Sequence, residues 1–478
     1  MFKVVSNSSS KKEKLILTSF LPWLLSLCLI KDPVCSYITA WLGSFFIFYL
    51  TIFSRLRYLE EGTQISSQIM RPIVLLQLVF AGFMCCTSVF YFLDHMGYQY
   101  LSDINTKNFV VTVDTFDLAR CQRYYVLGHA CLVAGLLAVL KRRIAPKYRF
   151  NRDLQQLLLP ICITCVFFAV VLGRLPGLGQ FSLPMRGIGE FSGTLLMVKG
   201  LYHKNLKQLL FGGTIFAYIF MSSTLTGYKE AVIVKVLMLL FLLFPYYKKL
   251  ISMVTLPILG ICLYILPTLA TTIRAQVWAG SDTAEQARLD AYELLVAPDP
   301  LSHVSETNWD FLKDRFSEIG MFRQYVNFVP VRHAYYGFDL LGNSLTALIP
   351  RALWKDKPST EIVSMERVYE SGAINRLSDV SAKTRPIVDA YLSAGVVGIC
   401  MVMLAYGMLA QAICNTAERL FGGYESGCIL VFNGIFQQLW RGNNLEFLIN
   451  NIFYGCVLMY GLFLILRKLN MLIPVRAN

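Results

Sequence analysis

The amino-acid sequence predicts an all-α protein, a polytopic transmembrane helix bundle of about 12 spans with one long helical loop outside the membrane. Hydrophobic residues make up 55% of the 478 residues, and charged residues make up 15%. Soluble domains contain about 25% charged residues, so a mean hydropathy of +0.53 indicates an integral membrane protein. The apolar stretches are continuous rather than alternating, which favours helices over a β-barrel.

The apolar stretches are close to the length of about 20 residues that crosses a bilayer as a helix. The predicted spans are 15–31, 33–53, 72–93, 124–140, 155–173, 187–203, 207–225, 229–246, 250–273, 387–412, 427–447 and 450–466. Lys11, Lys12 and Lys14 precede the first stretch in the manner of a signal peptide. No cleavage site of small residues follows, so we expect an uncleaved first span within a single integral membrane domain over 1–478.

A net charge of +14 raises the question of nucleic-acid binding. The basic residues, however, occupy short connections that all fall on one side of the twelve-span arrangement: Arg55, Arg57, Lys141, Arg142, Arg143, Lys147, Arg149, Arg152, His203, Lys204, Lys207, Lys248, Lys249, Arg467 and Lys468. This is the positive-inside pattern, and it predicts that both termini are cytoplasmic. The charge therefore reflects topology, and we expect no nucleic-acid partner.

The segment 274–385, between predicted spans 9 and 10, then lies outside the membrane. It carries 13 Lys and Arg against 15 Asp and Glu. Such a length is unusual for a loop without secondary structure, so we expect short helices packed on the membrane core. Helical spacing is present at 283–296 and 307–326, where the apolar face would contain Leu312, Phe316, Ile319 and Phe322. The apolar run Leu340–Leu348 is too short to span, and it predicts a re-entrant or buried helix.

The 13 cysteines lie mostly within apolar stretches, and none falls in 274–385. We therefore expect neither a disulfide framework nor a Cys/His zinc site.

Several cations fall at the outer ends of spans. They are Lys229 in a tight turn, Arg274, Arg174 and Arg186 around a Gly/Pro-rich loop, and Arg441 between the last two spans. Each one alone is as typical of an interfacial cation that reaches toward water as of an anion site. Their convergence on one face is the stronger argument for a site.

The long loop supplies further groups, which are Arg315, Arg323, Arg332, His333 and Arg351, with Asp314 and Glu318 beside them. Arginine binds phosphate through two parallel hydrogen bonds, which lysine cannot do. A histidine or carboxylate can accept a proton from a hydroxyl group. Surface ion pairing would explain any one of these residues, and the choice of base among His333, Glu318 and Asp314 stays open.

The most specific motif is Ile349-Pro350-Arg351-Ala352-Leu353-Trp354-Lys355-Asp356-Lys357-Pro358-Ser359. It resembles the Ile-Pro-x-x-Leu-Trp-Pro-x-(Lys/Arg)-Pro-Ser loop of the Wzy-type oligosaccharide repeat-unit polymerases, which include O-antigen and enterobacterial common antigen polymerases. The resemblance covers roughly 220–450 and extends to Lys229, Arg274, Arg441-Gly442 and the stretch 385–395. Lys229, Lys355 and Asp389 depart from the usual Arg, Pro and Glu of that family.

The resemblance implies a lipid-linked, GT-C-like glycosyltransferase of the bacterial inner membrane that uses neither metal nor cofactor. It would transfer a growing glycan from undecaprenyl diphosphate to the next lipid-linked repeat unit at the periplasmic leaflet. A chain-length regulator protein is a further implied partner. The implied diphosphate-binding residues are Lys229, Arg274, Arg351 and Arg441, supported by Arg323 and Arg174. His333 or Glu318 would be the base, with Arg351 also in the catalytic group.

Three other functions remain open. An O-antigen ligase shares the architecture and the donor but uses a lipid A-core acceptor. A lipid-linked oligosaccharide flippase or secondary transporter would have a similar number of spans, although transporters often contain internal repeats and this sequence shows none. A purely structural partner of the export machinery would tolerate single substitutions of the cations.

Overall fold

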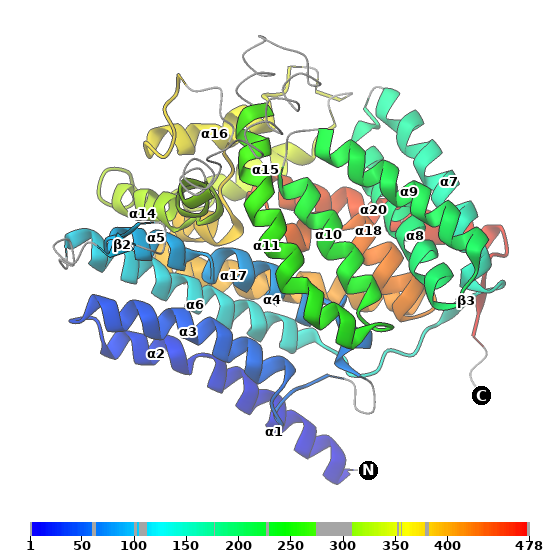
Figure 1. Cartoon of the computed structure of the whole chain (residues 1–478), viewed down its shortest axis with the longest axis horizontal. Helices are drawn as coiled ribbons and strands as arrows, with labels where there is room; N and C mark the ends of the chain where they lie inside the picture. The colour runs from blue at the N-terminus through cyan, green and yellow to red at the C-terminus, as the bar shows by residue number, and fades with distance from the viewer. Residues whose placement is uncertain are drawn as a thin grey trace.

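The structure, a computed structural model, describes residues 2–59, 64–99, 103–104, 112–175, 177–225, 229–273, 308–350, 353–354, 356–377 and 382–475 (Figure 1). It is predominantly helical, in agreement with the predicted all-α class. Arg274, Arg351 and the predicted helix at 283–296 lie outside the described residues.

Five described helical segments are long and apolar enough to cross a membrane. They are α3 (Pro33–Ile52), the segment Pro72–His95, α7 (Leu154–Arg174), α17 (Pro386–Leu420) and α20 (Leu445–Lys468). The chain is thus a membrane protein. Further helices overlap other predicted spans, namely α6 (Val113–Val139), α8 (Ser182–Tyr202), α9 (Leu206–Leu225), α10 (Lys229–Leu243) and α11 (Lys248–Ile273). The total of twelve spans stays a prediction.

The N-terminal region consists of α1 (Phe2–Ser19), α2 (Leu21–Cys28) and α3, whose first turn is capped by the Asp32 carboxylate accepting from the Cys35 N–H at 3.0 Å. The segment Pro72–His95 comprises α4 (Pro72–Phe80), a π-helical turn η2 (Ala81–Cys85) and α5 (Ser88–His95). A 3-10 turn η1 (Ile65–Gln68) precedes it, and another, η4 (Gly179–Phe181), precedes α8. Two short antiparallel strand pairs lie in the connections between helices. They are β1 (Tyr98–Gln99) with β2 (Asp103–Ile104), and β3 (Tyr148–Phe150) with β4 (Leu472–Pro474).

The core forms where α6 packs along α17, with α3 and α2 beside them (Figure 1). Two glycines permit the close approach of α6 and α17. A Cβ atom at Gly135 would lie 2.1 Å from the Leu404 carbonyl oxygen, and one at Gly407 would lie 2.3 Å from that of Leu132. Small residues at such crossings bring helix backbones together, which is how membrane helices gain packing contacts without a hydrophobic driving force. A second layer is formed by α7, α8 and α9.

Two segments near the C-terminus are interrupted helices. In α17 the backbone breaks at Ala394 and Gly395, where Gly395 has φ of +61° and ψ of −135°. The carbonyls freed by this break at Leu392 and Ser393 accept hydrogen bonds from the N–H groups of Tyr336 and Gly337, at 3.0 and 2.9 Å. The break therefore fastens the loop at 334–337 to the membrane core.

The predicted span 427–447 is not one continuous helix. It consists of the π-helical η7 (Tyr424–Phe432), the short α18 (Asn433–Ile435), a break at Phe436 and the short α19 (Gln437–Arg441). Gly442, with φ of +75°, ends α19, and the Asn444 side chain caps α20 by accepting from the Phe447 N–H.

The described part of the long loop folds into helices, as predicted. They are the π-helical turn η6 (Leu312–Phe316), α14 (Ile319–Phe328), α15 (Asp339–Leu348) and α16 (Thr360–Glu370). Ile319 and Phe322 are buried, but the helix predicted at 307–326 is interrupted at Ser317 and Glu318, before α14 begins. The predicted short helix at Leu340–Leu348 coincides with α15.

Candidate functional site

The start of α17 brings three distant segments together around Arg385. Pro386 at the first helical position places Arg385 in extended backbone at the N-cap. Its guanidinium donates to Glu318 Oε1 from Nε (3.1 Å) and Nη2 (2.8 Å), and Nη1 donates to the Gly442 carbonyl at 3.4 Å. The same group lies 4.9 Å from the ring centroid of Phe83. Arg385 thus links the long loop, α17 and the α19–α20 turn.

A cavity beside this junction, here called the arginine cavity, combines an apolar wall with two arginines. The apolar wall comes from α4, η2, α6 and neighbouring segments, and the full lining is Leu76, Val79, Phe80, Phe83, Met84, Leu132, Arg385, Pro386, Tyr406, Leu439, Trp440, Arg441 and Gly442. Cationic groups beside apolar surface inside a membrane protein are costly, and they commonly mark a ligand site. The arrangement places positive charge beside an apolar surface.

Two buried polar atoms at this junction have no hydrogen-bond partner among the described residues. One is Glu318 Oε2, the second oxygen of the carboxylate that pairs with Arg385. The other is Nε1 of Trp440, whose side chain is buried. Most buried polar atoms in proteins are paired, so these two are the atoms that a ligand would satisfy. The junction thus offers two guanidinium groups, an N–H donor and a carboxylate acceptor.

A second buried ion cluster lies close to Arg441. Lys235 on α10 donates to Glu190 on α8, and both side chains are buried. Arg186, one turn before Glu190, also pairs with it at 3.0 Å. The charges of Arg441 and Arg186 both act electrostatically on Lys235. Among the described residues of this cluster and the arginine cavity, cations therefore outnumber carboxylates, which favours an anionic ligand.

A buried network fixes the turn that carries Arg441. Arg367 on α16 donates to both oxygens of Asp389 (3.0 and 3.1 Å), both oxygens of Glu446 (2.7 and 2.8 Å) and the Thr384 hydroxyl (3.1 Å). Asp389 also accepts from the Leu445 N–H at 2.8 Å. Both carboxylates lie in the first turns of α17 and α20, where the helix dipole favours negative charge. The network locks the N-termini of these two helices together.

Among the residues predicted from the sequence, Arg441 lines the arginine cavity, and Glu318 is hydrogen-bonded to Arg385, which also lines it. Arg323 on α14 pairs with Asp114 at 2.9 Å and lies 6.0 Å from the ring centroid of Tyr91, and no described contact joins it to the arginine cavity.

The other predicted residues occupy different positions. His333 stacks between Phe328 and Tyr336, with ring centroids 5.8 and 4.5 Å away, and its Nδ1 contacts the Ala334 carbonyl at 2.6 Å. Arg174 is exposed at the end of α7, and Lys229 is the first residue of α10. No described contact joins His333 to the arginine cavity.

Asp314, the third candidate base, lies within 3.7 Å of Lys313, which also contacts Asp94 and Asp310. Desolvation by burial raises the pKa of the Asp314 carboxyl above its ordinary value. Asp314 is thus part of a local ion cluster on η6.

Four residues near the site were not predicted as site residues from the sequence: Arg385, Arg367, Glu190 and Lys235. Glu190 and Lys235 fall inside the predicted spans 187–203 and 229–246, and an ionisable residue within a span is itself a signal of function. Arg367 carried no such signal, because it lies among the many charges of the long loop, and Arg385 entered only as the first residue of the stretch 385–395.

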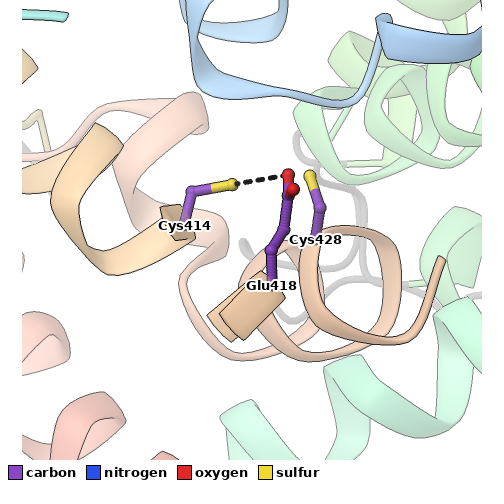
Figure 2. Close-up of side chains that lie close together, drawn as sticks. All are labelled: Cys414, Glu418 and Cys428. Atoms are coloured by element: carbon purple, nitrogen blue, oxygen red, sulfur yellow. Dashed lines mark hydrogen bonds between the residues drawn. The ribbon is translucent and has the colours of Figure 1, made fainter. Parts of the chain in front are cut away.

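One cluster has the composition of a metal site. Cys414 and Glu418, one turn apart on α17, and Cys428 on η7 place their ligand atoms within 4.8 Å of one another (Figure 2). However, Arg71 donates to both oxygens of Glu418 at 3.0 Å, and the Cys428 thiol contacts the Met70 carbonyl at 3.2 Å. A guanidinium on the carboxylate opposes a second cation, so we assign the cluster to helix packing. Cys414 and Cys428 are both free cysteines, without a disulfide bond.

The comparison with protein families identifies one match, the Domain of unknown function (DUF8712), over residues 21–474. This match covers nearly the whole chain, and the chain belongs to that family. No curated protein and no solved structure matches the chain significantly.

Proposed function

We propose that this protein polymerises the repeat units of a bacterial surface polysaccharide. It transfers the growing glycan from undecaprenyl diphosphate to the next lipid-linked repeat unit at the periplasmic leaflet of the inner membrane. The observation that carries the proposal is the arginine cavity, in which Arg385 and Arg441 adjoin an apolar wall. A polyprenyl diphosphate has the matching chemistry, since two phosphates are attached to a long hydrocarbon chain.

The cations stabilise the leaving group of this reaction. As the glycosidic carbon separates from the diphosphate oxygen, negative charge grows on the diphosphate. Preorganised donors aimed at such charge are usually the largest single contribution to catalysis. Arg385 and Arg441 supply forked guanidinium donors, and the unpartnered Trp440 Nε1 supplies a further N–H. Lys229, Arg274 and Arg351 are further diphosphate ligands in this proposal, with Arg323 and Arg174 in support.

The carboxylate of Glu318 is the base that the site geometry favours, with His333 as the alternative from the sequence. In the structure Glu318 Oε1 accepts from Arg385, whereas Oε2 is unpartnered among the described residues. A diphosphate on Arg385 competes with Glu318 for the guanidinium and frees the carboxylate. The oxygen of the acceptor hydroxyl then bonds to the sugar carbon while Glu318 accepts the hydroxyl proton. The diphosphate leaves as an anion.

The buried pair of Lys235 and Glu190 supports the same reading. Neighbouring Arg441 keeps the local charge positive, and added anionic charge relieves repulsion between Arg441 and Lys235. We therefore expect the diphosphate to contact Arg441 on the side that faces α10.

A glycan ladder tests the proposal. The gene is deleted and complemented with wild type, Arg441→Ala, Arg441→Lys, Arg385→Ala or Arg351→Ala at matched membrane levels, and surface polysaccharide is resolved on a gel. Deletion is expected to leave a single attached repeat unit. The alanine variants are expected to shorten or abolish the ladder, with partial recovery in Arg441→Lys because the point charge remains.

The matched control is Arg376→Ala, which removes an exposed arginine paired with Glu366 and should leave the ladder intact. Complete loss of attached glycan on deletion would indicate a ligase or a flippase and reject the polymerase. Normal ladders in both cavity variants would reject the arginine cavity as the diphosphate site.

A further inference from the structure

The loop helix α15 has a buried face that packs against the membrane span α20. Leu340, Ser344 and Ala347 form this face, and all three are buried. The Tyr454 hydroxyl of α20 donates to the Leu348 carbonyl at 2.6 Å, which fixes the C-terminal end of α15 on α20. One face of α15 is thus packed against the protein.

The remaining surface of α15 is divided into an apolar and a polar strip. The apolar strip follows a spacing of three and four residues through Phe338, Leu341, Leu345 and Ile349. These side chains are strongly exposed, Phe338 at 85% and Leu345 at 54%. Asp339 and Thr346 are exposed on the adjoining polar strip. A helix with separate buried, apolar and polar strips meets protein, hydrocarbon and water at once.

The depth of α15 follows from its contact with α20. Tyr454 lies nine residues after Leu445, the first residue of α20, which corresponds to roughly 13 Å along the helix axis. The hydrocarbon core of a bilayer is about 30 Å thick, so Tyr454 lies well inside one leaflet even if α20 projects by a turn. The C-terminal end of α15 must lie at the same depth because it is hydrogen-bonded there.

The surface of α20 beside this contact is also exposed and apolar. Phe453, Val457, Tyr460 and Leu464 repeat at three and four residues and form one strip. Phe453 is adjacent in sequence to Tyr454, and their rings contact edge to face at 5.1 Å. The exposed strip of a membrane span faces lipid, and Tyr454, which holds the end of α15, lies next to Phe453 of this strip.

The backbone carbonyls at the end of α15 are paired by side chains of the protein. The last carbonyls of a helix lack partners within the helix, and in hydrocarbon no water replaces them. Here the Lys357 ammonium donates to the carbonyls of Ala347 (2.7 Å) and Ile349 (2.9 Å), and the Tyr454 hydroxyl donates to the carbonyl of Leu348. Three consecutive terminal carbonyls are therefore paired by side chains.

We infer that α15 is a half-inserted helix whose apolar strip, Phe338, Leu341, Leu345 and Ile349, lies against the acyl chains of one membrane leaflet. The occupant of this surface is bulk phospholipid, and the inference does not depend on the proposed polymerase activity. It places Trp354, five residues after Ile349, close to the membrane surface.

Photo-crosslinking in vesicles tests this inference. The photoreactive residue p-benzoylphenylalanine is incorporated in place of Leu345, or in place of Thr346 as the matched control on the polar strip. Val457, on the exposed strip of α20, is the positive control. Folded, monodisperse protein is reconstituted in phosphatidylethanolamine and phosphatidylglycerol vesicles and irradiated, and phospholipid adducts are quantified by mass spectrometry.

We expect adduct yields at Leu345 to match those at Val457 and to exceed those at Thr346 several-fold. Equal yields at Leu345 and Thr346 would overturn the assignment of the two strips, and no adduct at Leu345 would overturn insertion. A parallel sample contains added undecaprenyl phosphate. Adducts at Leu345 with that lipid alone would replace bulk phospholipid by a polyprenyl chain and refute the inference as stated.

Discussion

Replacement of Arg367 by methionine removes the cation at the centre of the buried network. Arg367 donates five hydrogen bonds, to Asp389, Glu446 and Thr384. Its side chain is 2% exposed, and those of Asp389 and Glu446 are fully buried at 0%. Methionine fills a similar volume, so the substitution mainly removes charge and hydrogen bonds.

The magnitude follows from what is left behind. Breaking one buried ion pair by removing a partner costs about 3–5 kcal/mol, because the other charge stays buried without compensation. Arg367→Met leaves two such carboxylates, so we expect a free-energy loss at the upper end of that range. This is a large part of the roughly 5–15 kcal/mol that stabilises a typical folded protein. The stability of Arg367→Lys should fall between those of the wild type and Arg367→Met, because lysine keeps the charge but not the forked geometry.

The assay is the fraction of detergent-solubilised protein that remains monodisperse after heating. The matched control is Arg376→Met, whose ion pair with Glu366 is exposed (62% and 47%), so its melting curve should coincide with wild type. The triple variant with Arg367→Met, Asp389→Asn and Glu446→Gln should recover part of the loss, since no uncompensated charge remains. If Arg367→Met melts with the Arg376→Met control, the network does not stabilise the fold and the reasoning is wrong.

Three further predictions concern the helix break, the thiol cluster and the arginine cavity. Gly395→Ala should destabilise the folded protein by about 1–3 kcal/mol because Gly395 has a positive φ, whereas Gly342→Ala, in open space on a helix, should not lower the melting temperature. Equal effects of the two substitutions would contradict the strain argument. Arg71→Met should destabilise the folded protein by about 3–5 kcal/mol, because it leaves the Glu418 charge uncompensated. A chelator should leave the melting temperature of the wild type unchanged, and a lower melting temperature with chelator would indicate a bound metal ion. Trp440→Phe keeps the ring but removes the unpartnered N–H, so it should reduce long-chain glycan at unchanged melting temperature, and a full ladder would remove Nε1 from the site.

Local features of the chain could be predicted from the sequence because they depend on neighbouring residues. Continuous apolar runs determined where the helices lie, and the short run at Leu340–Leu348 was recognised as a helix too short to span. The positions at which helices break were not predicted. Gly395 and Phe436 interrupt apolar runs whose composition is that of an unbroken span, and the breaks depend on the loops and helices packed against them.

The candidate site was predicted only in part for the same reason. Arg441 was selected because it stands between apolar segments, and Glu318 because it lies near cations in the long loop. Arg385, which pairs with Glu318 and lines the arginine cavity, opens the stretch 385–395 of the resemblance, but its sequence position did not indicate that it would be a site residue. Which loop charges face the membrane core is decided by packing.

The sequence by itself determined that this chain is a helical membrane protein, since hydrocarbon admits only segments that satisfy their own backbone. Only the tertiary structure decided which buried charges meet. Arg385 and Glu318 are separated by 67 residues, Arg367 and Glu446 by 79, and Arg71 and Glu418 by 347. A buried charge is tolerated only beside its partner, and helix periodicity does not specify which helices become neighbours. Long-range ion pairing therefore builds the site on helices that the apolar composition predicts.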